Sequence, residues 1–151
     1  HMTNTSNLPI EALETEYPLM IERYEFCENS GGAGKYRGGL GILREYRPIG
    51  HKTTFSGQGE RFVNKPWGIF GGEPGGTGSF STVSDEGTST RLSNKPSTLR
   101  VGPDHVIRVI TAGAGGFGDP KERSKLQLKE DLESGKFSKD FLAKEYKQFN
   151  S

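Results

Sequence analysis

The chain has 151 residues, and hydrophobic residues together with 22 glycines make up about 45% of it, a share typical of globular domains. Its 20 Lys and Arg nearly balance 19 Asp and Glu, and the net charge of +1 gives no overall field to attract nucleic acid or an anionic membrane. The single cysteine, Cys27, excludes an internal disulfide and multi-cysteine zinc sites. No apolar run reaches the roughly 18 residues of a membrane span and no apolar secretory core stands at the start, so we expect a cytoplasmic protein without a membrane or nucleic-acid partner.

The first third of the sequence predicts a short helix and a wide antiparallel strand pair. Residues 9–16 predict the helix, with Pro9 at its first position. Residues 19–28 alternate as a strand, with Met20, Tyr24 and Phe26 on one face. Residues 29–39 contain five glycines and predict a structured turn or a binding loop. Residues 40–49 return as the second strand, and a third strand is predicted near residues 52–58.

The middle of the sequence is the least regular part. Glycine and serine dominate residues 59–90, around an apolar island from Trp67 to Phe70. Strand patterns resume at residues 97–101 and 105–111, separated by a turn at residues 102–104.

The last quarter predicts two helices. The first is expected to start with Asp119 as cap and Pro120 at its first position, with Glu122 completing a capping-box-like pair, and to run to about residue 134 before Gly135. The second starts at Ser138, with Phe137 and Leu142 placed for a hydrophobic staple, and carries Leu142, Tyr146 and Phe149 on one face. The prediction is therefore a single α+β domain over residues 1–151, with a core of antiparallel strands over about 17–112, glycine-rich loops and a helical tail over about 119–149.

One glycine run resembles a nucleotide-binding fingerprint. Gly113, Gly115 and Gly118 fit the pattern G-x-G-x-x-G after a predicted strand. In a dinucleotide fold the last glycine lies inside the helix, whereas Asp119 and Pro120 start a helix directly after it here, and no strand with a ribose-binding acid follows. A tight structural turn is therefore favoured, although amides beside a helix start are also able to bind an anion.

Other catalytic and binding patterns are weak or missing. Cys27 in a predicted strand is expected to be an inert thiol rather than a nucleophile. His51 and His105 lack companion acids at ligand spacing and are expected in turns or on the surface, so no metal site is predicted. The run from Tyr36 to Gly39 contains one RGG element, but such elements bind RNA as repeats within basic surroundings.

The positive signal is a set of arginines and aromatic residues among glycines, namely Arg37, Arg44, Arg61, Trp67 and Phe70. A guanidinium held by glycine-rich backbone suits the recognition of carboxylate or phosphate. In the alternative interpretation the aromatic residues fill the core and the arginines pair with acids.

Several sequence blocks occur in an order that is more specific than any one of them. The blocks are Asn4-Thr5, Asn7, Pro9, Glu11, Glu14, Tyr17-Pro18, Arg23-Tyr24, Ser30-Gly-Gly-Ala-Gly34, Tyr36-Arg37-Gly38-Gly39-Leu40-Gly41, Arg44-Glu45, Arg61, Pro66-Trp67-Gly68, Phe70-Gly71-Gly72, Pro74-Gly75, Gly115-Gly116-Phe117-Gly118-Asp119-Pro120, Arg123, Gly135, Ser138 and Tyr146. In this order they resemble the C-terminal portion of the hydantoinase B/oxoprolinase family. His1-Met2 is typical of what a cleaved cloning tag leaves behind, and we expect the chain to be a fragment.

The resemblance implies a role in a larger enzyme. It implies a B-type subunit of an ATP-dependent cyclic amidohydrolase, a hydrolase that opens a lactam or imide ring after an A-type, ATP-using partner has activated it. It also implies that the fragment is inactive alone and binds no cofactor, with ATP and a divalent metal used elsewhere in an oligomeric parent complex. The alternative is a noncatalytic docking module of that complex or of a related ATP-dependent carboxylase.

No catalytic residue is assigned from the sequence. The candidate substrate-binding residues are Arg37, Gly38, Gly39, Arg44, Arg61, Trp67, Gly115, Gly116, Gly118 and Asp119.

Overall fold

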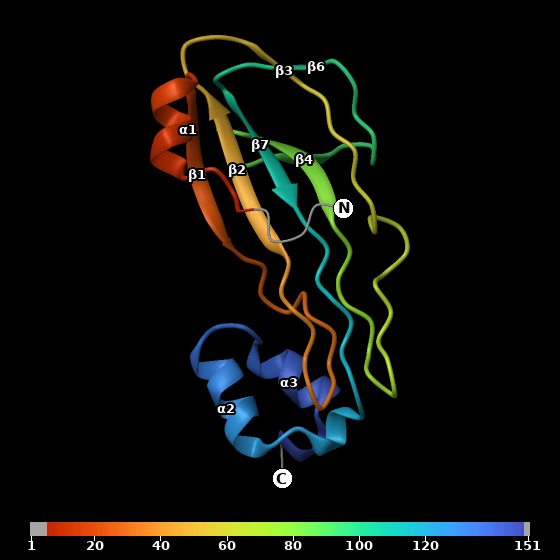
Figure 1. Cartoon of the computed structure of the whole chain (residues 1–151). Helices are drawn as coiled ribbons and strands as arrows, with labels where there is room; N and C mark the ends of the chain where they lie inside the picture. Colours follow the sequence, from red (N-terminus) through yellow and green to blue (C-terminus); the bar gives the residue numbers. More distant parts are fainter. Residues whose placement is uncertain (1–5, 150–151) are drawn as a thin grey trace.

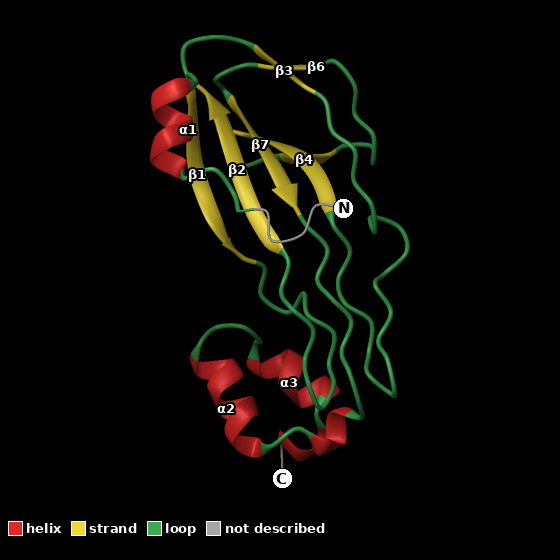
Figure 2. Ribbon diagram, viewed as in Figure 1, coloured by secondary structure: helices red, strands yellow, loops and turns green. Residues whose placement is uncertain are grey.

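The structure, a computed structural model, describes residues 6–149. It is an α+β fold in which an antiparallel sheet and a group of short helices lie at opposite ends of a layer of extended loops (Figure 1). Figure 2 shows that most of the chain between the sheet and the helices is loop. Within the described residues, no helix is long and apolar enough to span a membrane.

The main sheet has five strands in the order β1-β2-β7-β4-β5, and every neighbouring pair is antiparallel. The strands are β1 (Leu19–Phe26), β2 (Ile42–Pro48), β4 (Ser79–Ser84), β5 (Ser89–Arg91) and β7 (His105–Ile110). A separate ribbon pairs β3 (Thr53–Phe55) with β6 (Leu99–Val101). The predicted strand pair over residues 19–49 is confirmed, and so are the strands predicted near 52–58, 97–101 and 105–111.

The prediction of an irregular segment over residues 59–90 was wrong at its end, because β4 and β5 lie there. Strand β4 is bonded on both sides, to β7 and to β5. Its residues are mostly serine and threonine, which carry little apolar signal of their own. Pairing with β7 and the burial of Phe80, only 6% exposed, stabilise a strand that its composition does not indicate.

The expected face of β1 was also wrong in part. The register shifts between Ile21 and Arg23, and one extra residue in a strand moves the following side chains to the other face. Tyr24 is paired with Arg44 and Ile21 with Tyr46. Because Arg44 and Tyr46 are two residues apart on β2, Tyr24 and Ile21 lie on the same face of the sheet, while Met20 lies on the other face.

The predicted N-terminal helix is confirmed as α1 (Ile10–Glu16), with Pro9 as its N-cap rather than its first residue. The first tail helix is interrupted. Asp119 caps only the 3₁₀ turn Pro120–Glu122, and α2 (Lys125–Glu133) begins after Ser124, whose side chain forms a capping box with Gln127. The chain is extended at Arg123 because this side chain turns inward to a buried acid described below.

The second tail helix is confirmed as α3 (Lys139–Glu145), with Ser138 as its cap, followed by the 3₁₀ turn Lys147–Phe149. The core beneath the helices consists of Ala33, Leu128, Phe137, Leu142 and Tyr146. Because Ala33 belongs to a glycine-rich loop, this core fixes the helices to the loop layer. The Tyr146 hydroxyl strengthens the attachment by accepting a hydrogen bond from the Gly34 amide at 3.2 Å.

Candidate functional site

The predicted site residues gather mainly in the layer of loops between the sheet and the helices. Three segments, residues 30–41, 66–78 and 111–119, lie side by side there, and we call them the glycine bundle (Figure 1). The amide of Gly32 donates to the Ala114 carbonyl at 2.9 Å, Gly116 donates to Glu73 at 2.9 Å, and Glu73 donates to Ala33 at 2.7 Å. Each segment is therefore bonded to both of the others.

Glycine is required in the bundle by close contact between backbones. A Cβ atom on Gly38 would overlap the Ala114 carbonyl, and one on Gly116 would overlap the Ala33 carbonyl. Gly39 is different, because a Cβ atom there would meet nothing within 4 Å. Packing therefore accounts for Gly38 and Gly116 as candidates, but not for Gly39.

The glycine run that resembled a nucleotide fingerprint uses its amides inside the protein. Gly116, Phe117 and Gly118 donate to the carbonyls of Glu73, Tyr36 and Ile69, each at 2.9 Å. Donors already bonded to carbonyls are not free to cradle a phosphate. The run acts as a joint between β7 and the helical tail.

Asp119 has a local role at this joint. Its Oδ1 atom accepts a hydrogen bond from the Lys121 amide at 2.9 Å. The carboxylate thereby caps the 3₁₀ turn that the sequence predicted as the start of a longer helix.

Arg37 is held by a buried acid. Its Nε atom lies 3.0 Å from Oδ1 of Asp131, and Oδ2 of Asp131 lies 2.7 Å from Arg123. Asp131 is 2% exposed and Arg123 is 7% exposed, and Arg123 also donates to the Lys35 carbonyl at 3.0 Å. Two guanidinium groups thus share one carboxylate, which joins α2 to the glycine bundle. The sequence patterns did not reveal Asp131, because a single acid within a helix resembles the exposed acids around it.

Arg44 and Arg61 have aromatic partners instead. The guanidinium of Arg44 lies 4.1 Å from the centre of the Tyr24 ring and donates to the Tyr46 hydroxyl at 3.2 Å. Arg61 lies 4.7 Å from the centre of the Trp67 ring. Within residues 6–149, neither arginine forms an ion pair with Asp or Glu. Their positive charges therefore have no acidic partner in the part of the chain that the structure describes.

The predicted residues are therefore only partly brought together. The five candidate glycines, Arg37 and Asp119 belong to the glycine bundle. Trp67 belongs to it as well, and its carbonyl lies where a side chain on Gly115 would project. Arg44 is apart from them, in the sheet on β2.

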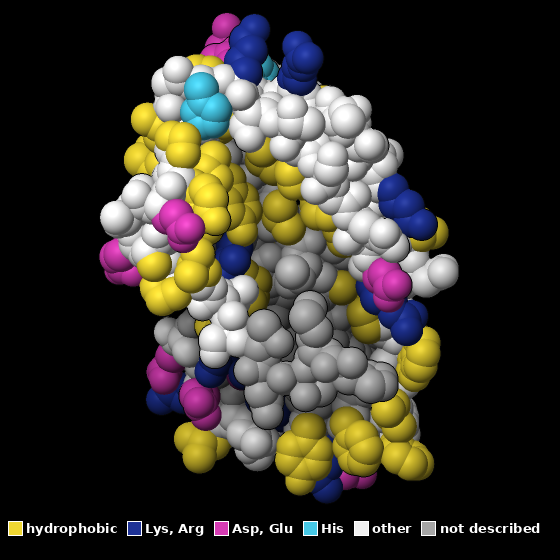
Figure 3. Space-filling model, turned by 45° about the horizontal axis from the view of Figure 1, so that its top comes forward, with side chains coloured by type: hydrophobic (Ala, Val, Ile, Leu, Met, Phe, Trp, Pro, Cys, Tyr) yellow, Lys and Arg dark blue, Asp and Glu magenta, His cyan; other side chains and the backbone are white. Residues whose placement is uncertain are grey.

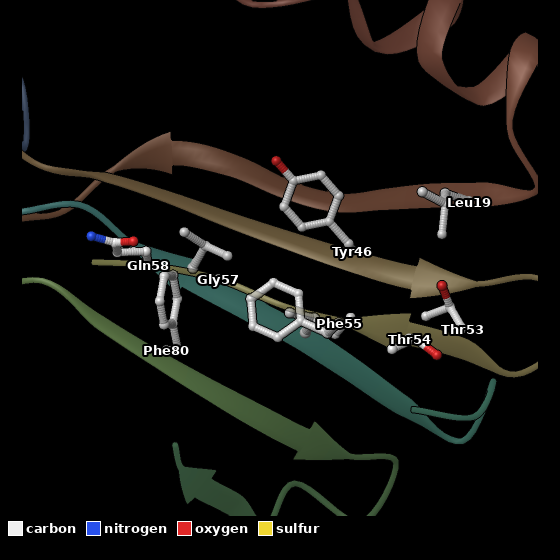
Figure 4. Close-up of a pocket in the computed structure, with 10 residues that line it drawn as sticks. Leu19, Tyr46, Thr53, Thr54, Phe55, Gly57, Gln58 and Phe80 are labelled. Atoms are coloured by element: carbon white, nitrogen blue, oxygen red, sulfur yellow. The ribbon is translucent and has the colours of Figure 1, made fainter. Parts of the chain in front are cut away.

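A groove of about 420 Å³ lies between the main sheet and β3, and no predicted site residue lines it (Figure 4). Figure 3 shows a hollow lined by hydrophobic side chains in the upper half of the molecule. The apolar walls come from both layers, and the lining residues are Leu19, Tyr46, Thr53, Thr54, Phe55, Gly57, Gln58, Phe80, Ile107 and Val109. The spacing of Ile107 and Val109 in β7 was the signal in the sequence that could have indicated part of this wall.

The groove is chemically suited to a small and mostly apolar group. Its polar side chains are the Tyr46 hydroxyl, Thr53, Thr54 and Gln58. Because the Tyr46 hydroxyl accepts a hydrogen bond from Arg44, a cation stands beside an otherwise apolar wall. Apolar walls with a few fixed polar groups are typical of small-molecule sites.

The remaining reactive groups lie outside this groove. Burial raises the pKa of the Cys27 thiol, and burial likewise raises the pKa of the Tyr146 phenol. His51 is exposed and lies 3.0 Å from the Ile49 carbonyl. In the described part of the chain no group of three or more His, Cys, Asp or Glu side chains is arranged to hold a metal ion.

Comparison with known proteins gives consistent matches. The chain is 33% identical over 144 residues to the B-type subunit of a putative D-/L-hydantoinase from Pseudomonas sp. (strain NS671), covering 95% of this chain and 24% of that protein. It is 35% identical over 118 residues to 5-oxoprolinase 1 of Arabidopsis thaliana, covering 78% of this chain and 9% of that protein. The crystal structure of the ATP-dependent caprolactamase from Pseudomonas jessenii has a similar fold, with a TM-score of 0.80 and 27% identity over 91% of this chain and 24% of that one.

The chain spans about a quarter of the length of the first curated relatives it matches. The first of the relatives above is named as a subunit. The sequence model of the hydantoinase B/oxoprolinase family matches residues 1–120. With most of its length covered by this match, the chain belongs to the hydantoinase B/oxoprolinase family.

Proposed function

We propose that this chain is the C-terminal domain of the B-type subunit of an ATP-dependent cyclic amidohydrolase and contributes to the opening of a lactam or imide ring. The observation that carries the proposal is the agreement of two independent comparisons. One relative is named as a putative hydantoinase subunit, and the solved structure with a TM-score of 0.80 is a caprolactamase. Hydantoin and caprolactam share one reactive group, a ring amide.

The chemistry of a ring amide explains why such an enzyme needs ATP. Amide resonance makes the carbonyl a poor electrophile, and phosphoryl transfer to its oxygen supplies a better leaving group. We assign the use of ATP, and of any divalent metal, to other parts of the complex. The amides of Gly113, Gly116 and Gly118, which would suit phosphate, are bonded to carbonyls here. This domain is then left with the tasks of binding and charge stabilisation.

Arg44 is the residue best suited to those tasks. Its charge has no acidic partner among the described residues, it is held in place by Tyr24 and Tyr46, and it adjoins the apolar groove. An apolar ring fits such a groove, and a fixed guanidinium stabilises negative charge that develops on an oxygen. Arg61 is the second candidate. Arg37 is the weakest, because Asp131 already compensates its charge.

The proposed partners follow from this assignment. They are the remainder of the B-type subunit and an A-type subunit that uses ATP, in an oligomeric complex in the cytoplasm. The subunit name of one relative supports a multi-subunit assembly.

Alanine substitutions in the complete complex test the proposal. With hydantoin, 5-oxoproline and caprolactam as substrates, we expect Arg44→Ala to lower ATP-dependent turnover by roughly 100-fold, a loss typical of removing one charge-stabilising donor. The melting temperature should change little. Arg37→Ala should instead lower the melting temperature, and exposed Arg91 on β5 serves as the control. Unchanged turnover in Arg37→Ala, Arg44→Ala and Arg61→Ala would refute the substrate-binding role.

A noncatalytic docking module of the same complex, or of a related ATP-dependent carboxylase, is the second candidate function. The internal use of the amides of Gly116, Phe117 and Gly118 favours it, because this loop then supports a surface rather than a ligand. Normal turnover in all three arginine variants, combined with loss of assembly when exposed apolar residues are changed, would support this function over the first.

A further inference from the structure

Four exposed apolar side chains cluster on the glycine bundle, and we call Tyr36, Ile69, Phe70 and Phe117 the aromatic tip. Phe70 packs edge-on against Phe117 with ring centres 5.2 Å apart, and Tyr36 lies 6.3 Å from Phe117. Their exposed fractions are 58% for Tyr36, 49% for Ile69, 79% for Phe70 and 46% for Phe117. In Figure 3, hydrophobic side chains gather at the lower edge of the visible face and also in other places on that face.

The aromatic tip is held by backbone bonds from three separate segments. Tyr36 and Phe117 exchange two hydrogen bonds, at 3.0 and 2.9 Å. The Ile69 amide donates to the Gly116 carbonyl at 2.9 Å and the Ile69 carbonyl accepts from the Gly118 amide at 2.9 Å. The side chains therefore project from a fixed platform, and little backbone freedom remains to be lost when a partner covers them.

The backbone conformation of Phe70 also supports a binding role for the aromatic tip. Its φ of +51° lies in the left-handed region, which a bulky side chain rarely adopts. The protein tolerates this strain at a residue whose ring is mostly exposed, so burial within the domain does not compensate for it. Strained residues of this kind concentrate at binding surfaces and functional sites.

The aromatic tip is comparable in size to the largest apolar patches that ordinary monomers expose. An aromatic side chain contributes about 150–250 Å² when buried, so the exposed fractions above amount to roughly 400 Å² of apolar surface. Patches of about 300–600 Å² are the largest that ordinary monomers expose, and they are often functional.

We propose that the aromatic tip is the surface on which the rest of a B-type polypeptide docks. The inference rests on the proposed function, and its occupant follows from length. The chain spans 24% of its hydantoinase relative and 24% of the solved caprolactamase chain, so about three quarters of such a polypeptide lies outside the residues described. A permanent neighbour also suits the chemistry, because permanent interfaces are more apolar than transient ones.

Thiol labelling tests the proposal in two settings. In a Cys27→Ser background, Phe70→Cys is compared with Leu126→Cys, whose native side chain is 77% exposed on α2, outside the aromatic tip. In the 151-residue chain both thiols should react with a maleimide at similar rates. In a complete B-type polypeptide that carries this segment, position 70 should react roughly 100-fold more slowly, because labelling then requires the interface to open, while position 126 stays fast.

The other labelling outcomes would overturn the proposal. Fast labelling at position 70 in the complete polypeptide means that the aromatic tip is uncovered. Protection only after the A-type subunit is added identifies that subunit as the occupant. Protection in the 151-residue chain that grows with its concentration identifies a second copy.

A cleavage experiment tests the same proposal without any cysteine variant. A protease site is placed before residue 6 in the complete polypeptide, and the two pieces are followed by size-exclusion chromatography after cleavage. They should stay together in the parent and in Leu126→Asp, and they should separate in Phe70→Asp. Separation in all three, or in none, overturns the proposal.

The same samples distinguish this inference from the proposed function. ATP-dependent ring opening is measured on the uncleaved complex with the three substrates named above. If no ring opening occurs while the pieces stay together and separate only in Phe70→Asp, the docking surface is supported and the amidohydrolase function is refuted.

Discussion

Alanine at position 38 tests whether backbone packing explains the glycines of the bundle. The new methyl group would overlap the Ala114 carbonyl, and the Gly115 carbonyl would lie 3.0 Å from it. The Ala114 carbonyl accepts a hydrogen bond from Gly32, and the Gly38 amide donates to the Gly32 carbonyl, both at 2.9 Å. Any movement that relieves the overlap therefore strains two hydrogen bonds, one between the segments 30–41 and 111–119 and one within the segment 30–41.

The expected cost is the sum of opposing contributions. Overpacking of this kind costs about 1–3 kcal/mol, and a weakened buried hydrogen bond costs about 0.5–1.5 kcal/mol. The lower entropy of the unfolded chain returns about 0.4–1 kcal/mol when glycine becomes alanine. The net loss in the free energy of unfolding should be about 0.5–4 kcal/mol. Its midpoint of about 2 kcal/mol corresponds to roughly 4–8 °C in melting temperature for a domain of this size.

Gly39→Ala is the matched control. It makes the same chemical change one residue away, where a Cβ atom meets nothing within 4 Å, so its melting temperature should equal or slightly exceed that of the parent. Both variants are compared by thermal unfolding followed by circular dichroism and by urea titration. Equal stability of the two variants would refute the packing argument, since only Gly38 faces a carbonyl.

Three further changes have defined outcomes. Asp131→Asn should lower the free energy of unfolding by about 3–5 kcal/mol in urea titrations, because it leaves the buried Arg123 without a counter-charge. The control Glu133→Gln, at an exposed position, should change the free energy of unfolding by less than about 0.5 kcal/mol. Equal effects of the two substitutions would contradict the role given to Asp131. Tyr146→Phe should cost about 1 kcal/mol at neutral pH by removing the hydrogen bond to Gly34. Burial raises the pKa of Tyr146 in the folded protein, so above pH 10 the unfolded chain loses this proton more readily than the folded protein does. The stabilisation by Tyr146 is therefore complete below pH 10 and is lost as the pH rises further. Above pH 10 the free energy of unfolding should fall less steeply with pH in the variant than in the parent, and parallel curves would exclude this linkage. Burial also raises the pKa of Cys27, so iodoacetamide at pH 8 should modify the folded protein more slowly than the urea-unfolded chain, and equal rates would show that the thiol is freely accessible.

Local features of the sequence were sufficient to predict most of the secondary structure. Pro9 and Gly135 mark helix ends through their own backbone preferences, and Ser138 does so through the side chain that caps the next turn. Alternation over residues 19–28 and 40–49 predicted the first strand pair in the same way. Fold class and family were also accessible, because the order of the glycine-containing blocks is a property of the chain itself.

The tertiary structure decided what those residues do. Gly38, Gly115 and Gly116 acquired a structural role because carbonyls of distant segments occupy the space beside them. The amides of Gly116 and Gly118 donate to carbonyls of the segment 66–78. Arg37 was separated from Arg44 in the same way, since an acid nearly a hundred residues later compensates the first and a pair of tyrosines holds the second. Composition and spacing indicate what a side chain is able to bind. Only the packing of distant segments determines which group that side chain contacts and which charged side chain stays available for a ligand.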